Sequence, residues 1–67
     1  MQVQVNGKQR EVSPPCSLLQ LLEQYEVNSQ LVAVEYNGEI IRREGFEAVV
    51  LKEGDVLEIV HMVGGGA

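Results

Sequence analysis

The sequence has little of what an independent enzyme or a metal site needs. Its 67 residues allow one domain with a thin core, because folding at this length buries only roughly 60% of the unfolded chain's surface. One cysteine and one histidine can form neither an internal disulfide nor a Cys/His metal cluster. No paired carboxylates and no nucleophile–base pair stand out. We therefore expect no catalytic residue, no metal and no cofactor bound by the chain itself.

Positive charge and long apolar runs are also scarce. Five Lys and Arg against ten Asp and Glu give a net charge of −5, which disfavours nucleic-acid binding. The apolar run at residues 48–51 is far shorter than the ~20 residues that cross a membrane. Residues 1–15 lack the apolar core of a secretory signal. These absences, with the lone cysteine, predict a cytoplasmic protein that is monomeric when free and does not contact membranes.

Hydrophobic residues make up 45% of the chain. At the start of the chain their spacing is typical of a β-hairpin. Apolar and polar residues alternate over residues 1–5, as in a half-buried strand. Asn6-Gly7 follows, a dipeptide that favours a two-residue hairpin turn. Residues 8–13 then form the returning strand, with Val12 as its apolar anchor.

A helix is predicted over residues 16–25. Its apolar residues recur with the period of a helix that packs on one side: Leu18, Leu21, Leu22 and Tyr25. Two starting points fit. Ser17 with Gln20 would form a capping box, whereas Ser13 as N-cap would place the two following prolines in the first turn.

The second half of the chain contains three further predicted strands or strand-like segments. Residues 31–36 and 56–62 are rich in β-branched residues, and residues 48–51 form a shorter strand. Between them, Ile40 and Ile41 are expected to be partly buried, and Arg42-Arg43 to lie in a solvated bend.

The order of these elements predicts one α+β domain over residues 1–62. A hairpin, a helix and further strands place one main helix on one face of a mixed sheet of four to five strands. This arrangement is the β-grasp, or ubiquitin-like, fold. Residues 63–67 are expected to form a separate, flexible glycine tail.

The tail carries the chemistry. Gly64, Gly65 and Gly66 pack nothing and would be costly to order, so they contribute little to a fold. Glycine can enter a channel too narrow for any other residue, and residues 63–67 can extend about 17 Å. Such a tail can deliver its carboxylate into another protein's active site. A passive end is the competing interpretation.

Five segments in order carry a resemblance to a known family. They lie at residues 3–7, 18–22, 32–41, 51–60 and 64–66. Over essentially its whole length the chain resembles the ThiS family, the thiamine-biosynthesis sulfur carriers.

The resemblance implies a mechanism that is carried out with partners. A ubiquitin-activating-type adenylyltransferase would use ATP and Mg²⁺ to adenylate the tail carboxylate. A cysteine desulfurase or related donor would supply sulfur, leaving a terminal thiocarboxylate. Thiazole synthase would then take the sulfur into the thiazole ring of thiamine.

The chain departs from the family at its last residue. Family members end in glycine, whereas Ala67 follows Gly66 here. Either Ala67 is removed before activation, or its carboxylate is used, or the natural chain ends elsewhere. We expect Gly66 to carry the reactive carboxylate after loss of Ala67.

Other residues near the tail have structural or partner-binding interpretations. Leu57 and Ile59 are expected to face the helix, which leaves Val60 and Met62, followed by Val63, as a patch where partners dock. His61 is interpreted as a surface residue and Cys16 as a buried structural thiol, although a persulfide on Cys16 is an alternative.

Two other functions fit the same pattern. The small subunit of molybdopterin synthase shares the fold, the tail and the thiocarboxylate. A non-reactive ubiquitin-like binding module would keep its binding activity after deletion of Gly65 and Gly66, whereas a carrier would lose all activity.

Overall fold

The computed structural model describes residues 1–62, and residues 63–67 lie outside the described residues. The elements in chain order are β1 (Gln2–Val5), β2 (Lys8–Glu11), α1 (Leu18–Gln24), the 3₁₀ helix η1 (Ser29–Leu31), β3 (Val32–Tyr36), β4 (Glu39–Ile41), the 3₁₀ helix η2 (Arg43–Gly45) and β5 (Val56–His61).

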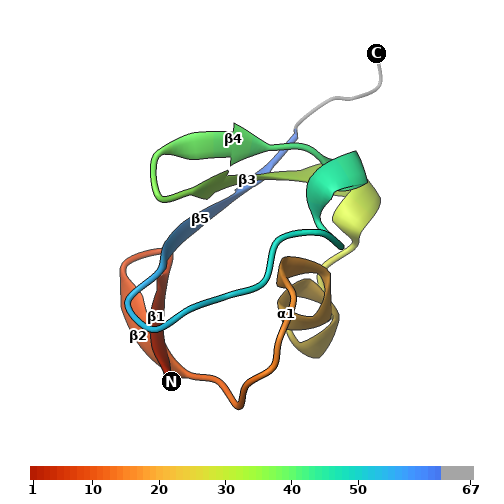
Figure 1. The fold of residues 1–67 in the computed structure, drawn as a ribbon. Coiled ribbons are helices and arrows are strands. Elements are labelled where there is room, and N and C mark those ends of the chain that lie inside the picture. The colour runs from red at the N-terminus through yellow and green to blue at the C-terminus, as the bar shows by residue number, and fades with distance from the viewer. Residues whose placement is uncertain (63–67) are drawn as a thin grey trace.

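The strands form one mixed sheet with β5 at its centre. The spatial order is β2-β1-β5-β3-β4, in which β5 runs parallel to β1 and every other pair is antiparallel. Helix α1 packs against one face of this sheet, and no other part of residues 1–62 covers the opposite face (Figure 1). The predicted α+β class, with a β-grasp sheet of five strands and one main helix, is confirmed.

The hairpin turn predicted at Asn6-Gly7 is confirmed, and the other Asn-Gly dipeptide, Asn37-Gly38, forms a second turn of the same kind. Asn6 and Gly7 have φ values of 52° and 84°, and Asn37 and Gly38 have 49° and 90°. Positive φ at both central positions gives the turn a twist that matches its flanking strands. These turns close the β1–β2 and β3–β4 hairpins in register.

The start of α1 is decided by a capping box. The Ser17 hydroxyl accepts a hydrogen bond from the Gln20 N–H at 3.1 Å, and the Gln20 side chain accepts one from the Ser17 N–H at 2.8 Å. Both bonds satisfy backbone donors that have no partner within the helix. The helix therefore begins after Ser17, and Pro14 and Pro15 lie in the connection before it.

The core lies between α1 and the covered face of the sheet. Its largest fully buried side chain is Phe46, which follows η2, and its helix residues are Leu18, Leu21 and Leu22. The strands contribute Val3, Val5, Val32, Val34 and Leu57. Val12 is buried as predicted.

Residues 48–51 do not form a strand of the sheet, so that prediction is wrong. Val50 makes only an isolated bridge to Ser17, and the neighbouring backbone bonds join Leu18 N–H to Val49 O and Leu51 N–H to Cys16 O. This extended segment pairs with the connection into α1. Its apolar composition reflects the burial of Leu51 in the core, not sheet pairing.

The expected partial burial of Ile40 is also wrong. Its side chain is 59% exposed, whereas Ile41 is half-buried. Side chains alternate along a strand, so the two neighbours point to opposite faces of the edge strand β4. Ile40 therefore points to the uncovered face.

A buried aspartate fixes the start of β5. The carboxylate of Asp55 accepts hydrogen bonds from the Tyr36 hydroxyl at 2.7 Å, the Lys52 N–H at 2.7 Å and the Asn37 amide at 3.1 Å. The Asn37 side-chain oxygen in turn accepts from the Val56 N–H at 2.8 Å. We call this network the Asp55 clamp. It consists of the Asp55 carboxylate, the Tyr36 hydroxyl, the Asn37 side-chain amide and the backbone N–H groups of residues 52 and 56. It joins the β3–β4 turn to the first residue of β5.

The clamp keeps Asp55 ionised. Burial alone would raise the pKa of the Asp55 carboxyl, but the hydrogen bonds from Tyr36, Lys52 and Asn37 and the nearby Lys52 ammonium outweigh it and lower that pKa. A buried carboxylate is stable only when its oxygens are satisfied in this way.

Substitutions at two adjacent residues of β5 test which face of the strand packs against the core. Leu57 is fully buried and Val56 is 40% exposed. We expect Leu57→Ala to lower the free energy of unfolding by about 2–5 kcal/mol, because it leaves a cavity. Val56→Ala should cost about 1 kcal/mol or less. Urea unfolding measures both, and equal losses would contradict the assigned register.

The Asp55 clamp predicts a loss of stability in acid. Asp55→Asn should lower the free energy of unfolding at neutral pH by about 1.5–3 kcal/mol, since it removes hydrogen bonds to a charged group. Because the folded pKa is lowered, the contribution of Asp55 is present above its unfolded pKa of about 3.9 and is lost as pH falls through the folded pKa.

Urea unfolding between about pH 7 and about pH 2 measures this dependence. The wild-type curve should fall more steeply in acid than that of Asp55→Asn. Glu39→Gln, at an exposed position, is the matched control and should keep the wild-type dependence. Parallel curves for wild type and Asp55→Asn would refute the role of the clamp.

Candidate functional site

The chain leaves the domain from the centre of the sheet. His61, the last residue of β5, pairs with Val32 of β3, and the Met62 N–H donates to the Leu31 carbonyl at 2.8 Å. The point from which the tail starts is therefore fixed by backbone pairing. The predicted reactive residues, Gly64, Gly65 and Gly66 with Val63 and Ala67 beside them, lie outside the described residues.

An apolar patch lies on the uncovered face beside this point. Val60 and Met62 are 53% and 51% exposed, and Ile40 adds an exposed side chain from β4. Ala33 pairs with Val60 in the register of β3 and β5. We call Ala33, Ile40, Val60 and Met62 the open-face patch. The predicted exposure of Val60 and Met62 is confirmed, and docking there stays a prediction.

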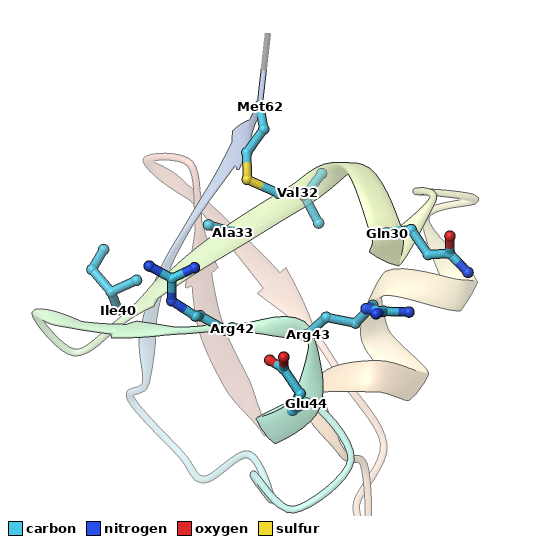
Figure 2. A pocket seen from close by; sticks show the side chains of 8 residues that line it. All are labelled: Gln30, Val32, Ala33, Ile40, Arg42, Arg43, Glu44 and Met62. Carbon is cyan, nitrogen blue, oxygen red and sulfur yellow. The ribbon is translucent and has the colours of Figure 1, made fainter. Parts of the chain in front are cut away.

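A hollow of about 250 Å³ opens next to the patch. It forms because β4 ends at Ile41, opposite Val34, so Val32 and Ala33 have no partner in β4. The chain then turns away into η2. Figure 2 shows the side chains that line the hollow: Gln30, Val32, Ala33, Ile40, Arg42, Arg43, Glu44 and Met62.

Two arginines contribute the positive charge of the hollow. Arg42 and Arg43 are exposed, as the prediction of a solvated bend requires, but their place in the wall of a hollow was not predicted. The position of the hollow depends on where β4 ends, and no local sequence signal marks that point. Within residues 1–62 the ion pairs are Met1 with Glu11 and Lys52 with Asp55, so neither arginine has a carboxylate within 4.0 Å there.

His61 and Cys16 are the two remaining candidate residues. His61 is exposed at the end of β5, as expected. Cys16 is 2% exposed and donates its thiol to the Ser17 carbonyl at 3.4 Å. Burial raises the pKa of the Cys16 thiol, which disfavours the thiolate that a persulfide carrier needs. The expected burial of Cys16 is confirmed.

Two other kinds of site are absent from the described part of the chain. Residues 1–62 hold no group of three or more His, Cys, Asp or Glu side chains placed to bind a metal ion. Among their helices, none has the length and apolar character needed to cross a membrane.

Comparison with known proteins gives a consistent family. The model of the ThiS family matches residues 3–66. The sulfur carrier protein ThiS of Bacillus subtilis is 43% identical over 65 residues, which are 96% of this chain and 98% of that protein. A thiazole synthase of Paramagnetospirillum magneticum is 39% identical over 67 residues, all of this chain but only 21% of that protein.

A solved structure agrees with these sequence matches. The crystal structure of a thiamine biosynthesis protein (ThiS) from Geobacter metallireducens superposes with a TM-score of 0.85 at 38% identity. The match covers 98% of this chain and 100% of that one. Sequence and fold thus agree over the described domain, and the family match continues to Gly66. The chain belongs to the ThiS family.

Proposed function

We propose that this chain is a sulfur carrier of thiamine biosynthesis and that its working group is the carboxylate of Gly66. The observation that carries the proposal is the extent of the family match, which includes all three tail glycines and stops before Ala67. The match to the sulfur carrier of Bacillus subtilis covers 98% of that protein and 96% of this chain.

Sulfur transfer to a carboxylate needs activation, because a carboxylate oxygen is a poor leaving group. A tail carboxylate oxygen attacks the α-phosphorus of ATP, and pyrophosphate leaves. A sulfur nucleophile then attacks the acyl carbon of the adenylate, and AMP leaves. The nucleophile is the outer sulfur of a persulfide on the donor, so the product is an acyl disulfide. A thiol then attacks the donor's sulfur, a disulfide forms on the donor, and the terminal thiocarboxylate leaves.

This chemistry divides between the carrier and its partners. A ubiquitin-activating-type adenylyltransferase binds ATP and Mg²⁺, and a cysteine desulfurase or related donor supplies the sulfur. The carrier supplies a carboxylate on three residues without side chains, which a narrow active-site channel admits. It needs no cofactor of its own for this role.

Thiazole synthase is the proposed acceptor of the sulfur. The thiazole synthase of Paramagnetospirillum magneticum contains a segment that matches this whole chain. A polypeptide that contains both a carrier-like sequence and a synthase sequence is consistent with direct transfer of sulfur from a carrier to a synthase.

The open-face patch is the proposed docking surface for these partners. Its exposed Val60 and Met62 lie on the uncovered face where the tail starts, and Val63 follows directly. A partner that covers this face buries apolar surface and also receives the tail. The opposite face is occupied by α1 and is not available.

Tail length tests the site of activation. A chain ending at Gly66 should be adenylated by the cognate adenylyltransferase in an ATP–pyrophosphate exchange assay. The chain ending at Ala67 should react roughly tenfold more slowly, because the extra alanine moves the carboxylate one residue beyond Gly66 and its methyl group overfills a channel shaped for glycine. A chain ending at Gly64 should not react.

All three chains keep residues 1–62, so equal thermal unfolding is the control. Efficient adenylation of the Ala67-terminated chain would contradict the assignment of Gly66. Full partner binding by the chain ending at Gly64, with no adenylation of any of the three, would instead identify a non-reactive binding module.

A matched pair of valines tests the docking surface. Val60 is 53% exposed on the open-face patch, and Val50 is 57% exposed on the segment beside Ser17. Val60→Lys should lower kcat/KM for adenylation by roughly tenfold or more, because it places a charge in an apolar interface. Val50→Lys should leave it within about twofold of wild type. Equal effects of the two variants would exclude the open-face patch as the docking surface.

A further inference from the structure

Two adjacent arginines line the hollow beside the open-face patch, and neither has a carboxylate within 4.0 Å among the described residues. The chain carries five Lys and Arg against ten Asp and Glu, so these two are a large share of its positive charge. Other cations contact the chain itself: Arg10 lies over a tyrosine ring, and Lys52 pairs with Asp55. Arg42 and Arg43 are thus available to an anion from another molecule.

The hollow and the open-face patch share part of their surface. Ala33, Ile40 and Met62 belong to the patch and also line the hollow. Figure 2 shows the Arg42 side chain reaching toward Ala33, with Ile40 beside it. The guanidinium group therefore lies at the edge of the apolar patch. A partner protein that covers the patch also covers the mouth of the hollow.

Covering the hollow takes the Arg42 guanidinium out of water. Arg42 is exposed in the free chain, and burial of a charge without a counter-charge is strongly unfavourable. Glu44 is the carboxylate of the wall, but it lies on the far side of the arginines in Figure 2 and forms no ion pair within residues 1–62. With Arg43 included, the charged groups of the wall sum to one positive charge. A protein that docks here gains from supplying one negative charge.

The size and lining of the hollow favour a carboxylate side chain as that negative group. Its volume of about 250 Å³ is below the roughly 300–1,000 Å³ of pockets that enclose a whole small-molecule ligand, which disfavours a free nucleotide. A guanidinium group offers two parallel N–H donors that match the two oxygens of a carboxylate. The methylene groups of an Asp or Glu side chain can pack on Ala33 and Met62, and the Gln30 amide can donate a further hydrogen bond.

Arg42 is the better placed of the two arginines. Arg43 also lines a second, more open hollow, where Glu44 and Glu47 are part of the wall. Its charge is therefore partly offset by these carboxylates. Arg42 lines only the hollow beside the open-face patch. The two neighbours thus differ in how much charge each can offer to a docked protein.

We propose that a partner protein covering the open-face patch inserts an Asp or Glu side chain into the hollow, where the Arg42 guanidinium binds its carboxylate. This role of Arg42 rests on the proposed function, because it takes the open-face patch to be the docking surface. It adds the chemistry that the partner's face must have, which is an acidic side chain within an apolar surface. Apolar contact supplies the buried area, and the ion pair fixes the register of docking and disfavours other proteins.

Binding of the full chain to the cognate adenylyltransferase tests this contact. Surface plasmon resonance without ATP gives the Kd and both rate constants. Arg42→Gln should raise the Kd roughly tenfold or more, mainly through faster dissociation, because it removes one member of a buried charge pair. Arg42→Lys keeps the charge but loses the two parallel donors, so its Kd should lie between those of wild type and Arg42→Gln. Arg43→Gln should have a smaller effect than Arg42→Gln.

Lys8→Gln is the matched control, since it removes an exposed cation from β2, outside the hollow. Its Kd should stay within about twofold of wild type. The amide spectrum of residues 1–62 checks that each variant is folded. Equal Kd values for wild type and Arg42→Gln would overturn the proposal. An effect of Arg42→Gln confined to the association rate and matched by Lys8→Gln would also overturn it, because long-range attraction alone would explain both.

Charge reversal identifies the acidic side chain. Arg42→Glu should abolish measurable binding, and a Lys in place of one Asp or Glu on the adenylyltransferase should restore it. If no such replacement restores binding, the proposed carboxylate is excluded. A wild-type chain that does not bind would contradict both the docking surface and the role of Arg42. A wild-type chain that binds but is not adenylated would instead contradict the proposed sulfur carriage and leave the Arg42 contact standing.

Discussion

The structure depends on how the central strand β5 is held. At its start the Asp55 clamp joins Val56 to the β3–β4 turn, and along its length β5 pairs with both β1 and β3. If the pairing of β5 shifted by one residue, Leu57 would leave the core and the side chains on the two faces of β5 would exchange places. Strand pairing and the hydrogen-bonded carboxylate of Asp55 together fix the register of β5, and this register decides which residues face solvent near the tail.

This register links stability to the proposed function. Leu57 is buried against the core, while Val60 and Met62 fall on the uncovered face and the backbone of Met62 is bound to Leu31. A partner that covers the open-face patch thus meets the tail at a fixed origin. The early end of β4 adds the hollow that Arg42 lines beside this origin.

Much of this arrangement follows from local sequence, and the rest follows from long-range packing. The Asn-Gly turns, the Ser17 capping box and the leucines of α1 are set by neighbouring residues, so they were predictable. Asp55, Phe46 and Arg42 acquire their roles from contacts with distant segments, which no local pattern reveals. Residues 48–51 were predicted as a strand because core packing and sheet pairing favour the same β-branched residues.

The central claim is that Gly66 carries sulfur, and the most direct measurement is the intact mass of the protein isolated from its own cells under thiamine starvation. The account predicts a species that lacks Ala67 and has one carboxylate oxygen replaced by sulfur. A single full-length species with an unmodified carboxylate would contradict it.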